Sequence, residues 1–442
     1  MKRVLFIAYH FPPVGGAGVQ RSLKFARYLP DSGYRPIVIT GPGEAFGEWA
    51  PLDATLAAEL DGSVEVHRVP GPVPEDTYGR LDRLVMRESE FSRWWRAGVL
   101  AEGQRHRDID LVCATMSPWE SGMAGAELAR RLGVPFVVDL RDPWALDEML
   151  SYTTRIHARA DLDCMRGTLA QADGIVMNCP QAGREVRERF PELAGKDVTV
   201  VPNGFDAEDF AGPAPQRSAA GLRIVHTGFL HTAFGSRRRN LVRRAVGGLP
   251  DGDPLTRSHI VLMEALRRVV EEHPELAKGL ELHLAGQLSD ADRSVDTLGL
   301  VREHGYLDHA ACIELMRSAD LLFLPMHDLP VGQRARIVPG KTYEYLGSGR
   351  PILAGVPDGD ARDLLSVLPW AHVCRPRDAE AMAAAITLEA RRKRRGGPAP
   401  DGDRSRVAAF ERRALTRRFA AVFDRQLAAE EPAGESVVPA AA

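Results

Sequence analysis

A short helix in the second half of the chain carries the residues whose types and spacing point most directly to chemistry. It lies in the stretch RARIVPGKTYEYLGSGRPILAG, residues 334–355, where Pro-Gly precedes Lys341 and Gly-Ser-Gly ends the helix. Lys341 therefore falls in the first helical turn, where the helix dipole disfavours a cation. Since Lys341, Arg334 and Arg336 also repel one another, we expect this helix start to bind a phosphate.

Glu344 follows one turn after Lys341 on the same face of the predicted helix. We expect its carboxylate to accept hydrogen bonds from sugar hydroxyls. The alternative is an ion pair between Lys341 and Glu344, which stabilises a helix by only about 0.2–0.5 kcal/mol. That ion pair does not account for so many cations at one helix start, so we favour the phosphate interpretation.

A glycine-rich turn follows the first apolar run of the chain, in HFPPVGGAGVQRS, residues 10–22. Gly15, Gly16 and Gly18 can adopt positive φ and let a ligand approach the main chain, while the next helix offers free N–H groups. Arg21 stands where a dinucleotide-binding fingerprint needs its third glycine, which disfavours a dinucleotide site. Close packing alone is the alternative reason for these glycines.

Polar side chains also end two neighbouring strands, in ATMSPWES (114–121) and VDLRDPW (138–144). The carboxyl edge of a parallel sheet is where such folds bind ligands. We expect four of these residues on the acceptor side of a site: Thr115, Ser117, Asp139 and Arg141. The alternatives are an Asp139–Arg141 ion pair and an N-cap role for Asp142.

Three loops of the second half are further candidates. Gly228 ends a strand and is followed by Arg237, Arg238 and Arg239, of which one or two could join a phosphate site. The other two loops contain Gly286 and the pair Tyr306 and Leu307. We expect Tyr306 and Leu307 to sandwich a flat base, with a core tyrosine as the alternative.

Size and composition set the frame for these residues. A chain of 442 residues predicts two domains. A net charge of −3 gives no reason to expect nucleic-acid binding. The five cysteines show no CxxC pair and no cluster with histidine, which indicates a reducing compartment and no structural zinc site. No apolar run resembles a secretory or membrane-spanning segment, so we expect a cytoplasmic protein.

Strand-like and helix-like patterns alternate along both halves and predict two Rossmann-like, doubly wound parallel-sheet α/β domains facing a cleft. The predicted strands of the first half are 4–9, 36–40, 64–69, 110–114, 135–140, 174–178 and 198–201. We predict domains at 1–209 and 222–403, a linker at 210–221, a final amphipathic helix at 404–429 and a disordered tail at 430–442.

Several of these motifs together resemble the GT-B fold glycosyltransferases, in particular the family 4 (group 1) bacterial sugar transferases. They are FPPVGGAGVQRSLKFARYLPDSGY, VDLRDPW, VPNGFD, and VPGKTYEYLGSGRPILAG with the preceding SADLLFLP. The resemblance implies a nucleotide-diphosphate-sugar donor held by the second domain, an acceptor on the first, and a final helix that crosses back to the first domain. It implies no cofactor besides the donor.

Carried over to this chain, the resemblance matches Glu344 to the residue that binds the donor ribose. Lys341 and the Arg237–Arg239 group become candidates for the diphosphate, with the Gly15–Gly18 loop opposite. The family pattern places a further glutamate eight residues before Glu344, where this chain has Arg336. Arg336 is therefore a donor-side candidate that departs from the family.

The expected reaction is retaining and metal-independent, with Lys341 stabilising the leaving diphosphate. His10 or Asp142 acting as a base would suit an inverting route instead. A catalytically silent sugar-nucleotide-binding subunit and an epimerase or phosphorylase on the same scaffold are alternatives. The acceptor stays open among a glycan, a lipid-linked saccharide and a metabolite, with peripheral membrane contact through Arg155 and Arg159 and a monomer or homodimer as further options.

Overall fold

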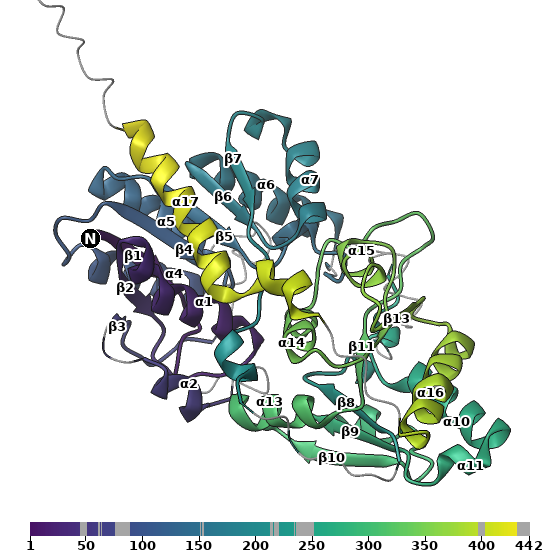
Figure 1. Cartoon of the computed structure of the whole chain (residues 1–442). Coiled ribbons are helices and arrows are strands. Elements are labelled where there is room, and N and C mark those ends of the chain that lie inside the picture. Colours follow the sequence, from purple (N-terminus) through teal and green to yellow (C-terminus); the bar gives the residue numbers. More distant parts are fainter. Residues whose placement is uncertain are drawn as a thin grey trace, which may run out of the picture.

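Two α/β lobes, each built on one parallel sheet, make up the molecule (Figure 1). The computed structural model describes the chain except residues 45–50, 61, 63, 76–88, 151, 153, 213–214, 216–220, 234, 236–251, 397–402 and 431–442. The expected fold class is confirmed. The predicted linker and tail, and the arginines 237–239, lie largely or wholly outside the described residues.

The amino-terminal lobe holds a seven-stranded sheet in the order β3-β2-β1-β4-β5-β6-β7. Its strands are β1 (Lys2–Ile7), β2 (Tyr34–Thr40), β3 (Glu65–Arg68), β4 (Leu111–Thr115), β5 (Phe136–Leu140), β6 (Gly174–Met177) and β7 (Asp197–Val200). The α-helices are α1 (Ala17–Tyr28), α2 (Ala54–Ala58), α4 (Glu90–Gly103), α5 (Glu120–Leu132), α6 (Arg155–Gln171) and α7 (Pro180–Arg189). Strands β4 and β5 are buried along their whole length because helices cover both faces.

The carboxyl-terminal lobe holds a six-stranded sheet in the order β10-β9-β8-β11-β12-β13. Its strands are β8 (Arg223–Thr227), β9 (Glu281–Ala285), β10 (Val301–Gly305), β11 (Leu321–Pro325), β12 (Ile352–Gly355) and β13 (Ala371–Cys374). The α-helices are α10 (Ile260–Glu272), α11 (Pro274–Ala277), α12 (Asp290–Arg293), α13 (His309–Ser318), α14 (Gly340–Ser348), α15 (Asp360–Ser366) and α16 (Ala379–Arg394). In both sheets the strand order reverses at the first strand, which places a ligand-binding crevice at the carboxyl ends of the strands.

The last helix, α17 (Arg412–Glu430), lies against α1 of the amino-terminal lobe (Figure 1). The rings of Phe25 and Phe419 stack with centroids 4.3 Å apart, and Tyr34 donates a 2.6 Å hydrogen bond to Asp424. The sequence predicted one continuous helix from residue 404. Instead a 3-10 helix (Arg404–Phe410) precedes α17, and the two are separated by Glu411 in an extended conformation.

The chain crosses between the lobes in two segments that meet. The Phe205 N–H donates to the carbonyl of Phe410 over 3.1 Å, and the Arg412 N–H donates to the carbonyl of Phe205 over 2.9 Å. These bonds form a parallel bridge between Phe205 and Glu411. The outgoing segment is therefore fastened to the returning one.

Candidate functional site

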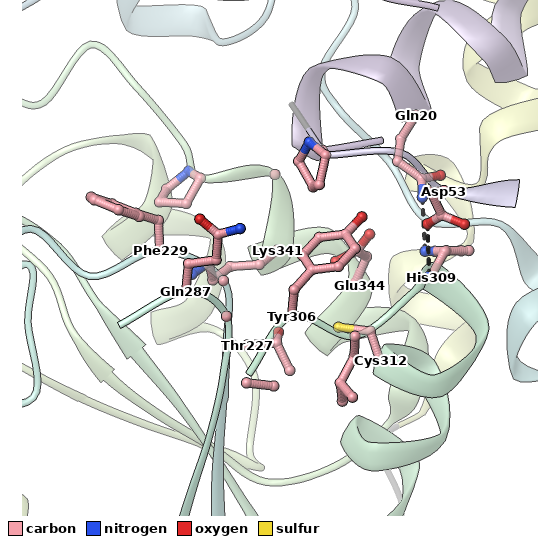
Figure 2. A pocket seen from close by; sticks show the side chains of 18 of the residues that line it. Gln20, Asp53, Thr227, Phe229, Gln287, Tyr306, His309, Cys312, Lys341 and Glu344 are labelled. Atoms are coloured by element: carbon pink, nitrogen blue, oxygen red, sulfur yellow. Dashed lines mark hydrogen bonds between the residues drawn. The ribbon is translucent and has the colours of Figure 1, made fainter. Parts of the chain in front are cut away.

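A cavity of about 360 Å³ lies between the lobes at the carboxyl ends of both sheets. We call it the interlobe cavity. It brings together these residues predicted from the sequence: Gly16, Gly228, Gly286, Tyr306, Leu307, Lys341 and Glu344. Figure 2 shows Lys341 and Glu344 of α14 directed into the same space as Tyr306 and Gln287.

Lys341 lies in the first turn of α14, with its Nζ 3.3 Å from Nε2 of His226. The other ring nitrogen of His226 donates to the carbonyl of Phe323 over 3.0 Å, which leaves Nε2 as an acceptor for the ammonium. Burial and the neighbouring Arg257 lower the pKa of Lys341 to about 7. Burial and Lys341 in turn lower the pKa of His226, so the histidine stays neutral.

Two glycines let the main chain approach this lysine closely. Gly228 has a φ of 104°, and a Cβ there would lie 2.8 Å from the Lys341 Nζ. Gly286 has a φ of 139°, and a Cβ there would lie 2.6 Å from the carbonyl oxygen of Gly228. A side chain at Gly228 or Gly286 would be strained or would clash. Main chain and open space therefore lie in front of the Lys341 ammonium.

Arg257, just before α10, lines the same cavity and was missed in the sequence. Its guanidinium contacts the Met149 sulfur at 3.0 Å, and burial lowers its pKa. Among the described residues, neither Arg257 nor Lys341 has a carboxylate within ion-pair distance. Arg257 was overlooked because it is a single arginine in PLTRSHI, whereas residues 237–239 are three consecutive arginines and were the more obvious candidates for a phosphate site. Asp147, Asp142 and Glu148 act on Arg257 from longer range, and Glu344 acts on Lys341. The cavity thus holds two partly desolvated basic side chains, each without a close carboxylate among the described residues.

Glu344 and Tyr306 line the cavity beyond the lysine. No ion pair joins Glu344 to Lys341 in the described part of the chain, so the alternative of a simple helix pair is not realised. The Tyr306 side chain is 39% exposed, which excludes a core role. A Cβ on Gly15 would lie 2.7 Å from the Tyr306 hydroxyl, so the glycine turn and this ring meet across the lobes.

His309 connects the lobes at the rim of the cavity, and we call its contacts the His309 clasp. Its main-chain N–H donates to Asp53 over 2.9 Å, and its Nδ1 lies 2.7 Å from Nε2 of Gln20. Its Nε2 lies 2.9 Å from Asp209. The interaction with Asp209 raises the pKa of His309 in spite of its burial. Figure 2 shows Gln20 and Asp53 reaching this histidine from the amino-terminal lobe.

His10, Gly18, Arg141 and Asp142 gather at the edge of the amino-terminal sheet. A Cβ on Gly18 would overlap the Arg141 guanidinium at 1.6 Å, so the arginine packs directly across this glycine. Arg141 Nε lies 3.7 Å from an Asp142 oxygen. Burial and Arg141 lower the pKa of His10 to about 4, which keeps its ring neutral. None of these four is among the residues lining the interlobe cavity.

The structure corrects the expectation for Asp139. Its side chain is 0% exposed and accepts hydrogen bonds from Arg21 Nη2 at 2.6 Å and Nε at 2.9 Å. Arg21 also donates to the carbonyls of Val201 and Pro202. The pair therefore ties α1 to β5 and to the segment after β7 and is closed to an acceptor; Asp139 pairs with Arg21 of α1, and not with Arg141 as the alternative had it. Thr115 is also buried, and Ser117 has a φ of 89°; neither lines the interlobe cavity.

The structure also corrects the expectation that Arg334 and Arg336 join Lys341 at one phosphate site, because the two arginines do not converge on Lys341. Arg336 lines a separate cavity of about 790 Å³, with its Nε 3.3 Å from Glu185 and its N–H donating to Glu148. Arg334 pairs with Asp363. We call this second space the arginine-lined cavity; its arginines are Arg155, Arg159, Arg189, Arg334 and Arg336.

Residues 15–204 match the family model described as a glycosyl transferase 4-like domain. The full chain superposes on sucrose-phosphate synthase from Thermosynechococcus elongatus with a TM-score of 0.62 at 16% identity, covering 97% of this chain and 100% of that one. The chain is a glycosyltransferase of the GT-B fold.

The transferase is 26% identical over 363 residues to D-inositol 3-phosphate glycosyltransferase of Nocardiopsis dassonvillei, across 80% of this chain and 78% of that protein. It is also similar in fold to Anabaena HepE, solved with UDP and glucose, with a TM-score of 0.56 at 16% identity over 96% of this chain and 100% of that one. No helix among the described residues of the transferase is long and apolar enough to cross a membrane.

Proposed function

We propose that the transferase moves a sugar from a nucleotide-diphosphate donor bound in the interlobe cavity to an acceptor hydroxyl. The observation that carries this proposal is that Lys341, in the first turn of α14, and Arg257, just before α10, line one cavity, and neither has a carboxylate within ion-pair distance among the described residues. A diphosphate would bring negative charge into direct contact with these two side chains and the helix start, whereas the carboxylates that act on Lys341 and Arg257 lie beyond ion-pair distance.

The remaining lining fits the other parts of such a donor. Tyr306 and Leu307 offer a flat and an apolar surface for the base, and the Glu344 carboxylate can accept from ribose hydroxyls. Gly16 opposite provides the approach for the phosphates or the sugar. The complexes of HepE with UDP and with UDP-glucose support a uridine nucleotide as the first donor to test.

Bond cleavage leaves a growing negative charge on the diphosphate, which Lys341 and Arg257 are placed to stabilise. On this basis we propose a metal-independent reaction. We keep the retaining outcome from the family resemblance. An inverting route needs a base, and the two candidates from the sequence, His10 and Asp142, do not line the interlobe cavity. The anomeric configuration of the product distinguishes the two routes.

We place the acceptor on the side of the arginine-lined cavity. Five arginines line this cavity with three carboxylates, and some of the arginines are already paired, among them Arg336 with Glu185 and Arg334 with Asp363. The remaining excess of positive charge favours an anionic acceptor such as a phosphorylated polyol. The relative from Nocardiopsis is named for an inositol phosphate, which is a phosphorylated polyol.

A thermal-shift screen across UDP-, GDP-, dTDP- and ADP-sugars tests the donor proposal, because a ligand at ~100 times its Kd adds about 2.7 kcal/mol of stability. With the donor found, Lys341→Ala and Arg257→Ala should each lower turnover about 10²–10³-fold, as for loss of one preorganised charge-stabilising group. Lys278→Ala, at an exposed lysine outside the cavity, is the matched control.

Two results would overturn the proposal. If both cavity variants bind and turn over the donor like the Lys278→Ala control, the cavity is not the donor site. If donors bind but no nucleotide diphosphate is released with any acceptor, the alternative of a silent sugar-nucleotide-binding subunit holds instead.

A further inference from the structure

A cluster of histidine and glutamate side chains lies at the outer edge of the amino-terminal lobe. Glu65 and His67 are two residues apart on the edge strand β3, so they share one face of the sheet. His106 follows the end of α4. One ligand atom from each of the three lies within 4.8 Å of the other two. The cluster is not visible in the sequence because its two histidines are 39 positions apart.

Both ring nitrogens of His67 face a carboxylate. Its Nδ1 lies 3.0 Å from Oε1 of Glu102, and its Nε2 lies 2.8 Å from Oε1 of Glu65. A neutral imidazole has only one N–H, so if Nδ1 donates to Glu102, the Nε2 lone pair points at the lone pairs of Glu65. Two lone pairs at this distance require a cation between them, either a proton or a metal ion.

His106 makes the metal ion the better choice. Its side chain is only 9% exposed, and its Nε2 lies 3.7 Å from Oε1 of Glu102, which is too far for a hydrogen bond, and has no hydrogen-bond partner among the described residues. The ring lies beside that of His67, with centroids 4.5 Å apart. A proton on His67 would leave Nε2 of His106 without a partner in the described part of the chain. A metal ion bound by all three side chains would give the His106 ring a ligand role.

The surrounding charges hold the carboxylates in place for this role. Arg35 pairs with Oε2 of Glu65 at 3.3 Å, and Arg105 pairs with Oε2 of Glu102 at 2.7 Å. Both arginines thus bind the outer oxygens and leave the Oε1 atoms directed at His67.

We propose that Glu65, His67 Nε2 and a ring nitrogen of His106 bind a divalent transition-metal ion, with zinc as the preferred occupant. Two imidazoles and one carboxylate form a ligand set that zinc takes readily. Glu102 then acts as the outer carboxylate that accepts the Nδ1–H of His67 and fixes its orientation. The ion would pin the edge strand β3 to the end of α4, apart from the interlobe cavity.

The test is calorimetric titration of Zn²⁺ into the chelator-treated full chain. We expect one site, weakened at least tenfold by His106→Gln or His67→Gln, and about 10–100-fold by Glu102→Gln through loss of the outer partner. His283→Gln is the matched control: His283 also lies beside a histidine and a glutamate on a strand, but its Nδ1 is only 2.9 Å from His304 Nε2. This control should leave Zn²⁺ binding unchanged.

A second measurement keeps the proposal testable if a variant does not fold. Co²⁺ added to the unaltered chain should give visible absorption bands of a nitrogen- and oxygen-ligated ion, which one equivalent of Zn²⁺ abolishes. Absence of these bands, or Zn²⁺ binding equal in the His106→Gln and His283→Gln variants, overturns the proposal. Far-ultraviolet circular dichroism of each variant serves as the folding control, because it does not depend on the proposed donor site.

Discussion

Lys341 is the residue whose charge depends most on what occupies the interlobe cavity. Burial and Arg257 bring its pKa to about 7, so above neutral pH the free protein holds much of this side chain uncharged. A bound diphosphate favours the ammonium form and raises this pKa again.

We therefore predict that binding of a nucleotide diphosphate takes up a proton when the pH is above about 7, and that affinity falls as the pH rises further. Titration calorimetry in buffers of different ionisation enthalpy measures this uptake. Lys341→Met should lose it. Equal proton uptake by the unaltered chain and this variant would show that another group is responsible.

A second prediction at the residue scale concerns the backbone conformation at Gly228 and its effect on donor binding. Gly228→Ala should weaken donor binding at least tenfold, because the new methyl group meets the Lys341 Nζ at 2.8 Å and φ is 104°. Gly133→Ala is the control for strain alone, since Gly133 has a φ of 69° with nothing within 4 Å of its added Cβ. Equal donor affinity in the two variants would contradict the prediction.

The elements were more predictable than the site. Helix α14 was found because Pro339, Gly340 and Gly349 mark its ends in the sequence itself. The strands expected in the second half were 222–227, 280–285, 321–325, 351–355 and 373–375. Strand β10 was missed because most of its side chains are exposed and it lacks the apolar run of a buried parallel strand. Arg257 was missed because its place beside Lys341 depends on how β8, α10 and α14 pack, which no local pattern encodes.

Helix α17 is the element whose loss we expect to affect the amino-terminal lobe most. Phe419 is fully buried and stacks on Phe25, so Phe419→Ala should lower the free energy of unfolding by about 3–5 kcal/mol. Chemical denaturation followed by circular dichroism measures this loss. Arg417→Ala, at an exposed position on the same helix, should change stability by less than about 0.5 kcal/mol; a similar loss in both variants would argue against packing as the cause.

At the scale of the whole molecule, the His309 clasp holds the two lobes around the cavity. His309→Ala removes the ring contacts to Gln20 and Asp209 but keeps the main-chain bond to Asp53. We predict a larger radius of gyration for the free variant by X-ray scattering, with the difference lost at saturating donor. His273→Ala, at the end of α10, is the control, and an unchanged radius in His309→Ala would mean that other contacts hold the lobes.

The bridge between Phe205 and Glu411 determines how such opening can proceed. Two parallel segments joined in this way can bend together at right angles to their length. Sliding one segment along the other would break both hydrogen bonds. We therefore expect any movement of the lobes to bend the outgoing and returning segments together and to leave both hydrogen bonds intact. Gly16 of the amino-terminal lobe should then return to the same place opposite Lys341 after each opening, so that the donor we propose would meet the same two surfaces in every cycle.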